Sequence, residues 1–171
     1  MTTDDGRGRL LPNMEDHKCF GCSPRNPSGL KMKFYACEAS VCSYVTVPEH
    51  LCGWDNVVHG GVLATILDEI MSRSVLYTAR SLGMTRSMTV DFRKPAFVGQ
   101  ELRAEGRVLE VKEGREARAE GVIYNGDGRI CAGAVGVFAL LSPEFIRKMG
   151  VAGERVLDFF NRHIQALDDA P

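Results

Sequence analysis

The sequence has almost no excess charge, since 21 Lys and Arg residues stand against 22 Asp and Glu residues in a chain of 171. A chain so nearly neutral lacks the basic surface that attracts nucleic acid or an anionic membrane. It also lacks an apolar run long enough to span a bilayer, and no apolar segment follows a basic N-terminus as in a secretory signal peptide. We therefore expect a cytoplasmic protein that has neither a nucleic-acid nor a membrane partner.

A second Cys-x-x-Cys pair is also missing, and this decides how the six cysteines are interpreted. One pair, Cys19-Phe20-Gly21-Cys22, has His17 close by, but a structural zinc site needs about four ligands, usually from two such pairs. Irregular spacing and the lack of a signal peptide favour reduced thiols over disulfides. We therefore expect a loop with two buried thiols here, and no metal. The other four cysteines are Cys37, Cys42, Cys52 and Cys131.

What the sequence does contain is the pattern of one globular domain, because 44% hydrophobic and 25% charged residues are ordinary values for such a fold. Residues 1–18 are largely polar, which predicts a flexible N-terminal segment. Residues 19–141 carry the periodic patterns of a folded domain, and residues 142–171 predict a helical extension. That extension begins with Ser142-Pro143-Glu144, a capping serine followed by proline at the first helical position.

The order of the predicted elements indicates the fold class. Two strands precede a long helix over residues 61–81, and four strands follow it without the intervening helices that a doubly wound parallel sheet requires. The sequence therefore predicts an α+β fold, in which a single antiparallel sheet wraps around one long central helix. The strands are expected over residues 30–35, 41–47, 87–93, 100–111, 115–124 and 129–141, and the terminal helices over residues 143–149 and 154–167.

Apolar residues cover most of the circumference of the long predicted helix, which indicates a helix buried on nearly all sides. Its polar stripe is made of Gly61, Thr65, Asp68 and Ser72, which share one face because successive residues turn by about 100°. An acid in such a stripe is costly to bury unless it has partners or a task. Asp68 is therefore a candidate catalytic residue, whereas Glu69, at the margin of the stripe, is expected to form a structural salt bridge.

The triplet His59-Gly60-Gly61 stands at the start of this helix. The first backbone N–H groups of a helix have no partner within it, so they are free to meet an electron-rich oxygen. A buried acid close to such donors suits acyl chemistry, because the donors can stabilise the oxyanion that forms. Two further histidines, His50 and His163, are expected at the surface.

Three stretches of the sequence resemble the hotdog-fold acyl-CoA thioesterases, in particular those similar to phenylacetyl-CoA thioesterase. CFGCSPRNPSGLKMKF, at residues 19–34, is similar to the N-terminal loop and first strand of one branch of that family. His59-Gly60-Gly61, with Asp68 nine positions after the histidine, resembles its central motif. SMTVDFRKPAFVGQELRAEGRV, at residues 87–108, resembles the segment that follows. The resemblance implies hydrolysis of an acyl-CoA to a free acid and CoA, without a cofactor.

By position, the resemblance implies that Asp68 acts as general base or as nucleophile, and that the Gly60 N–H donates to the oxyanion. Gly61 allows close approach of the substrate, and His59 holds the loop or contacts the thioester. Thr85 falls where relatives carry a residue that positions the water. The family further implies a homodimer, or a homotetramer made of two dimers, with active sites at the subunit interface.

One position departs from the family pattern. Relatives often carry Asn or Gln six or seven residues before the histidine, where this sequence has Gly53 and Cys52. Either the neighbouring Trp54, Asp55 or Asn56 replaces that side chain, or the donor is missing. Of these three, Asn56 is the residue we assign to substrate binding. Lys112 and Arg115, on a predicted turn, are the basic residues best placed to reach the phosphates of CoA.

Three alternatives stay open. A non-catalytic acyl-CoA sensor would use the same pocket, and the missing Asn or Gln favours it. A hotdog hydratase or dehydratase typically combines a histidine and an acid in a different arrangement, so the histidine-glycine motif with its acid argues against it. A zinc-binding interaction protein built on Cys19 and Cys22 is the third, and metal analysis would distinguish it.

Overall fold

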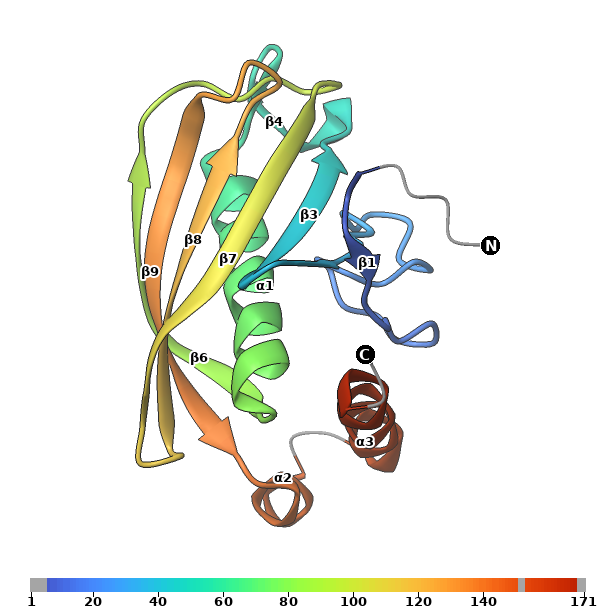
Figure 1. The fold of residues 1–171 in the computed structure, drawn as a ribbon. Coiled ribbons are helices and arrows are strands. Elements are labelled where there is room, and N and C mark those ends of the chain that lie inside the picture. Colours follow the sequence, from blue (N-terminus) through green and yellow to red (C-terminus); the bar gives the residue numbers. More distant parts are fainter. Residues whose placement is uncertain (1–5, 151–152, 169–171) are drawn as a thin grey trace.

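A computed structural model of the chain describes residues 6–150 and 153–168, and Figure 1 shows its ribbon. A seven-stranded sheet wraps around one long helix, α1 (Gly60–Ala79), and all neighbouring strands in it run antiparallel. The expected α+β architecture is therefore confirmed. In sheet order the strands are β1 (Arg9–Leu10), β2 (Tyr35–Cys37), β3 (Ser40–Thr46), β7 (Glu101–Lys112), β8 (Glu116–Tyr124), β9 (Ile130–Leu141) and β6 (Leu82–Phe92).

Helix α1 is held in place by burial over most of its circumference. Ile66, Leu67 and Ile70 are fully buried in the core between helix and sheet. Burial of one such side chain contributes roughly 1.5–3 kcal/mol. The sheet comes closest at Gly106 of β7, where an added Cβ would lie 2.7 Å from the Ile70 carbonyl oxygen. A larger residue there would therefore push the sheet away from the helix.

Strand β6 forms one edge of the sheet. It pairs with β9 from Leu82, opposite Leu141, to Phe92, opposite Ala132, so it begins well before the strand predicted from residue 87. Among the described strands none pairs with its outer side. Phe92 and Met84 are large hydrophobic side chains that β6 leaves 58% and 43% exposed. A long edge strand of this kind is a template for pairing with another chain.

The loop predicted between the second strand and α1 contains short ordered elements. A turn of 3-10 helix (Glu49–Leu51) leads into the two-stranded hairpin of β4 (Cys52–Trp54) and β5 (Val57–Val58). The Val58 N–H donates to the Ala96 carbonyl at 2.9 Å, which ties the hairpin to the segment after β6. These bonds fix the point at which the chain enters α1.

The strand predicted over residues 30–35 is present only at its last residue. Burial alternates along it as predicted, but the structure begins β2 at Tyr35. The preceding backbone bonds to the irregular loop instead: the Met32 N–H donates to the Gly21 carbonyl at 3.0 Å. Alternating burial therefore arose here from packing against α1, without a partner strand.

The N-terminal segment makes contacts that the sequence did not indicate. Arg9–Leu10 pairs with β2, and Leu11 is 2% exposed within the core. The Asn13 side chain donates to the Cys22 carbonyl at 2.8 Å. Residues 1–5 of the segment expected to be flexible lie outside the described residues.

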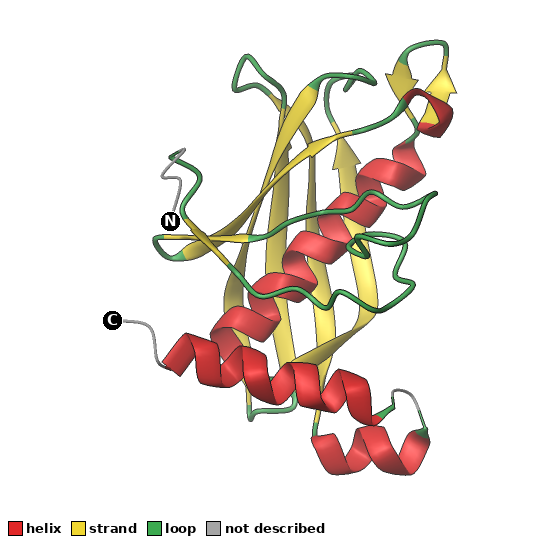
Figure 2. Cartoon of the chain, turned by 90° about the vertical axis from the view of Figure 1, so that its right-hand side faces the viewer, coloured by secondary structure: helices red, strands yellow, loops and turns green. Residues whose placement is uncertain are grey.

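Two helices follow the sheet, α2 (Pro143–Met149) and α3 (Glu154–Asp168). The Ser142 hydroxyl accepts from the Phe145 N–H at 3.1 Å, which is the predicted N-cap. Helix α3 lies beside the C-terminal half of α1 (Figures 1 and 2) and buries Leu157 and Leu167. Across residues 6–150 and 153–168, no helix is both long and apolar enough to cross a membrane.

His163 on α3 is fully buried, so its expected surface position is wrong, whereas His50 is exposed as predicted. The surface position was predicted because histidine is polar. Residue 163 instead lies on the face of α3 that packs inward, and its ring centroid is 5.7 Å from that of Phe159. Neither ring nitrogen has a hydrogen-bond partner among the described residues. Burial, with a smaller contribution from the positive charge of Arg73, lowers the pKa of His163 from 6.5 to about 4.

This burial predicts a stability loss in mild acid. Because the folded pKa is the lower one, the unfolded chain takes up the proton first, so the stability is present above pH 6.5 and is lost as pH falls towards 4. The loss is about 3 kcal/mol. His163→Leu should remove this pH dependence and be more stable at neutral pH, since two unpaired polar atoms are gone. Urea unfolding at both pH values measures it. His50→Leu is the control, and an equal acid loss in both variants would contradict the assignment.

Candidate active site

The N-terminus of α1 is organised by His59. Its backbone is extended, with φ −61° and ψ 135°, and its Nδ1 accepts from the Gly61 N–H at 2.9 Å. A neutral imidazole that accepts at Nδ1 carries its proton on Nε2. The histidine thus serves as the N-cap of α1. The N–H of Gly60, the first helical residue, has no hydrogen-bond partner within the described part of the chain.

Asp68 and Thr85 are brought together from separate elements. The Thr85 hydroxyl on β6 donates to Asp68 Oδ1 at 2.7 Å. Asp68 is half-buried, on the side of α1 that faces the β6 edge. One carboxylate oxygen is thereby oriented by a donor, and the other is available to accept a proton or attack a carbon. Thr65 and Ser72, on the same stripe, are half-buried as well.

With this geometry in place, the sequence was compared with known families. The profile described as Thioesterase superfamily matches residues 55–132, from the turn before α1 to the start of β9. The match contains both His59-Gly60-Gly61 and the Asp68–Thr85 pair. This segment, which makes up less than half of the chain, is similar to the thioesterase superfamily. The resemblance to hotdog-fold thioesterases is confirmed on this ground.

Solved thioesterase-superfamily structures share the fold of this chain. Thioesterase superfamily member 2 of zebrafish is 22% identical, with a TM-score of 0.59 over 65% of this chain and 82% of that one. The PaaI protein from the phenylacetic acid degradation operon of E. coli is 19% identical, with a TM-score of 0.60 over 66% and 81%. A Streptococcus mutans protein bound to acetyl-CoA is 17% identical, with a TM-score of 0.60 over 65% and 89%. No curated protein matches the sequence.

The position of the missing Asn or Gln lies directly beside the cap. A Cβ added at Gly53 would stand 3.3 Å from His59 Cα and 3.5 Å from its ring carbon Cδ2. Asn56, the suggested substitute, is exposed in the β4–β5 turn, and its backbone carbonyl accepts from Val98. No hydrogen bond of its side chain occurs within the described residues.

The basic turn assigned to CoA lies at the Asp68–Thr85 end of the sheet. Glu116 pairs with Ala139, which in turn pairs with Met84, so the turn before Glu116 is two strands away from Thr85. Lys112 and Arg115 are both exposed there, and Lys112 Nζ lies 3.6 Å from a Glu110 carboxylate oxygen.

A cavity of about 270 Å³ lies beyond Asp68 along α1. It is lined by Ser72, one helical turn past Asp68, and by Leu76, whereas Met71 and Val75 are buried in the core. Loop residues and α3 close the other side of this cavity, which the sequence could not indicate, because they come from the two ends of the chain.

Glu69 differs from its prediction. It was expected in a salt bridge, but its Oε1 accepts a hydrogen bond from Cys19 Sγ at 3.2 Å, beneath the N-terminal loop. Burial raises the pKa of Glu69 to about 7, and the nearby Cys19 acts in the same direction. Sequence spacing could not reveal this contact, because 50 residues separate the two partners.

Proposed function

We propose that this protein hydrolyses an acyl-CoA thioester to a free acid and CoA. The observation that carries the proposal is the Asp68–Thr85 pair, an oriented carboxylate next to a sheet edge in a thioesterase-superfamily fold. The acetyl-CoA bound to the Streptococcus mutans structure supports the substrate class. A Streptococcus pneumoniae structure of the same fold, 18% identical, also contains coenzyme A.

In the proposed mechanism the thioester carbonyl accepts a hydrogen bond from the Gly60 N–H, which faces the charge that develops on oxygen. Asp68 either takes a proton from the attacking water or attacks the carbonyl carbon itself. In both routes the C–S bond breaks and CoA leaves as the thiol or thiolate. The first route gives the free acid directly, whereas the second gives an anhydride on Asp68, which water then hydrolyses to the free acid and the regenerated carboxylate. Thr85 keeps one carboxylate oxygen fixed, so the reactive oxygen has a defined direction.

The Gly60 N–H and the Asp68 carboxylate of one chain are too far apart to act on the same thioester. Gly60 and Asp68 are eight residues apart on α1, a separation of about 12 Å along the helix axis. A carbonyl oxygen that accepts a hydrogen bond from the Gly60 N–H at about 3 Å is still several ångströms too far from the Asp68 carboxylate and its water to react. One complete site therefore needs a second copy of the chain.

Strand β6 supplies a geometry for that second copy. A Cβ at Gly60 would lie 3.5 Å from the Phe92 ring, and Thr85 bonds to Asp68, so β6 passes both positions. If two β6 strands pair antiparallel about a two-fold axis near Met88, Thr85 lies opposite Phe92 of the partner subunit. Asp68 then faces the glycine donor of the other copy. We infer a homodimer with composite sites, which is also the unit from which a homotetramer would form.

The cavity beyond Ser72 is our candidate for the acyl group, and the Lys112–Arg115 turn for the CoA phosphates. Both lie at the Asp68 end of the site, one toward the interior and one at the surface. Asn56, in the turn before α1, lies at the Gly60 end and stays our candidate for a substrate contact.

Hydrolysis of an acyl-CoA panel, from short to long and aromatic acyl groups, tests the function. The loss of thioester absorbance should be followed directly, because six cysteines interfere with thiol reagents. Turnover on part of the panel supports the proposal. Absence of turnover on every member contradicts it.

A second candidate, a non-catalytic acyl-CoA sensor, is favoured by one observation. Gly53 offers no side chain beside His59, where relatives often have a donor. Isothermal titration with a non-hydrolysable thioether analogue separates the two functions: tight binding together with no turnover of the matching acyl-CoA would favour the sensor.

Replacing Thr85 should reduce turnover. Thr85→Val keeps the shape but removes the hydrogen bond to Asp68, and a bond to a charged group contributes about 1.5–3 kcal/mol. We expect kcat to fall roughly 10- to 100-fold. Thr46→Val is the matched control, since Thr46 is exposed on β3, outside the proposed β6 interface. Equal rates in both variants would rule out the positioning role.

A further inference from the structure

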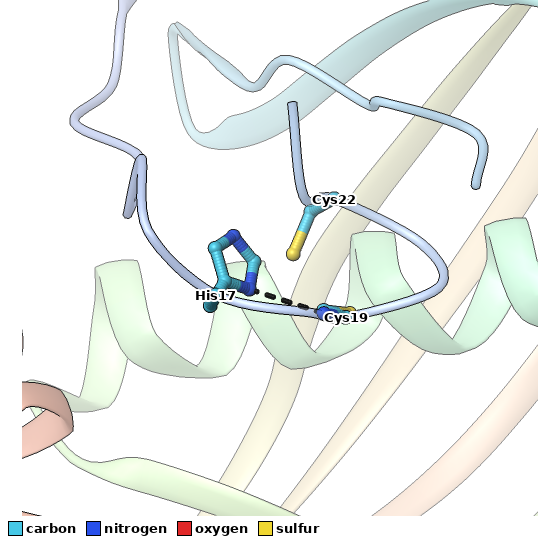
Figure 3. A group of neighbouring side chains, drawn as sticks. All are labelled: His17, Cys19 and Cys22. Carbon is cyan, nitrogen blue, oxygen red and sulfur yellow. Dashed lines mark hydrogen bonds between the residues drawn. The ribbon is translucent and has the colours of Figure 1, made fainter. Parts of the chain in front are cut away.

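Three metal-ligating side chains converge in the N-terminal loop. One nitrogen of His17 and the sulfurs of Cys19 and Cys22 all lie within 4.8 Å of one another. Figure 3 shows the His17 ring and the Cys22 side chain on the same side of the loop, which crosses over α1. The proposed chemistry at Asp68 uses none of the three, although His17 and Cys22 line the cavity of about 270 Å³ beside α1.

Helix α1 adds a fourth donor beneath this loop. Glu69 Oε1 lies 3.2 Å from Cys19 Sγ. The backbone of the loop packs closely against the Glu69 side chain, since a Cβ added at Gly21 would lie 2.3 Å from Glu69 Cγ. Cys22 is 8% exposed and Glu69 is half-buried, and both line the cavity of about 270 Å³ beside α1.

The spacing of these atoms suits a tetrahedral ion after a small contraction. Bonds of about 2.0–2.3 Å from zinc to nitrogen, oxygen and sulfur place neighbouring ligand atoms roughly 3.3–3.8 Å apart. The ligand atoms of His17, Cys19 and Cys22 already lie within 4.8 Å of one another, and Glu69 Oε1 lies 3.2 Å from the Cys19 sulfur. Two sulfur donors with one nitrogen and one oxygen favour zinc over magnesium or calcium, which prefer oxygen alone.

The charge of the surroundings suits a bound cation. Two thiolates, one carboxylate and Zn²⁺ carry a net charge of about −1, and Arg73, one turn after Glu69 and 8% exposed, supplies the opposite charge. Its guanidinium is held by the Pro12 carbonyl and Asn13 Oδ1, each at 3.2 Å.

We propose that His17, Cys19, Cys22 and Glu69 form a structural Zn²⁺ site. The ion would fasten the N-terminal loop onto α1 at the residue next to Asp68. A sequence pattern alone could not identify this site, because a single Cys-x-x-Cys provides half a ligand set and the fourth ligand lies on a distant helix. The site does not depend on the proposed hydrolysis, and its test uses no activity measurement.

Metal content is the first measurement. The full chain should be purified without a histidine tag or chelator, in a phosphine reductant, and analysed by elemental mass spectrometry. We expect about one zinc per chain in the wild type and in the control Cys37→Ser/Cys52→Ser, and almost none in Cys19→Ser/Cys22→Ser. Equal zinc in the two double variants overturns the site. So does a zinc-free wild type that also fails the cobalt titration.

Cobalt substitution tests the ligands of the metal-depleted protein. Added Co²⁺ should give thiolate charge-transfer bands in the near ultraviolet and the intense visible bands of four-coordinate geometry, in the wild type and not in Cys19→Ser/Cys22→Ser. Glu69→Gln should weaken Co²⁺ binding about 10-fold or more while retaining the thiolate bands. Unchanged affinity and visible spectrum in Glu69→Gln overturn Glu69 as the fourth ligand. Absence of thiolate bands in the wild type overturns the whole site.

Discussion

Asp68→Asn is expected to lower kcat for acyl-CoA hydrolysis by about 10²–10⁴-fold, the range lost when a positioned acid or base is removed. Asparagine has the shape of aspartate and can still accept the Thr85 hydrogen bond at Oδ1. It can neither take a proton from water nor form an anhydride, so both routes fail. Steady-state kinetics on the best substrate of the panel measures the effect.

The control for this variant is Asp127→Asn, an exposed acid in the β8–β9 turn. It removes the same charge from the chain far from α1 and should leave kcat unchanged. Unfolding curves of both variants should match the wild type. A fully active Asp68→Asn would exclude the carboxylate from the chemistry, and the site would then have to be sought elsewhere in the fold.

The sequence was most informative where one residue pattern had one physical solution. A helix that is apolar over most of its circumference must be covered by other elements, as the sheet covers α1. The helix begins within one residue of the prediction because His59-Gly60-Gly61 marks its start. The turn Asn125-Gly126-Asp127-Gly128 correctly separated β8 from β9. The resemblance implied separate roles for Asp68 and Thr85 in one site, and the hydrogen bond that joins them is seen only in the structure.

Contacts between distant segments could not be derived in this way. Glu69 meets Cys19 only because the N-terminal loop crosses α1, and α3 buries His163 only because its inward face packs beside the same helix. Likewise β1 is too short to have a periodic pattern of its own. Each of these depends on where a terminal segment docks, which is a property of the assembled core rather than of local sequence.

Adjacent acids on α1 thus have separate surroundings. Asp68 faces the open β6 edge and bonds to Thr85, whereas Glu69 lies beneath the loop and bonds to Cys19. Because successive residues of a helix are turned by about 100°, the proposed catalytic carboxylate of Asp68 and the carboxylate of Glu69 lie on different faces of α1. The same helix therefore carries the proposed chemistry on one face and the proposed metal site on the next.

Gly60→Pro is expected to reduce kcat by about 10²–10³-fold, the cost of removing one oxyanion donor. Proline suits this position, because Gly60 is the first helical residue and His59 already has the extended backbone that precedes proline. An added Cβ makes only ordinary contact with Phe92, at 3.5 Å. Gly60→Ala retains the N–H and is the control. Equal rates in the two variants would show that this N–H is not the donor.

Mixing the two inactive variants should restore activity, and this result would decide where the site lies. In a heterodimer of Asp68→Asn and Gly60→Pro chains, isolated with two different tags, one composite site carries both defects and the other carries neither. We expect about half the wild-type rate per dimer. The reciprocal heterodimer, wild type with the double variant, has one defect in each composite site and should be inactive. If both halves of the site came from the same chain the outcomes would be reversed, because each wild-type chain would then keep an intact site of its own.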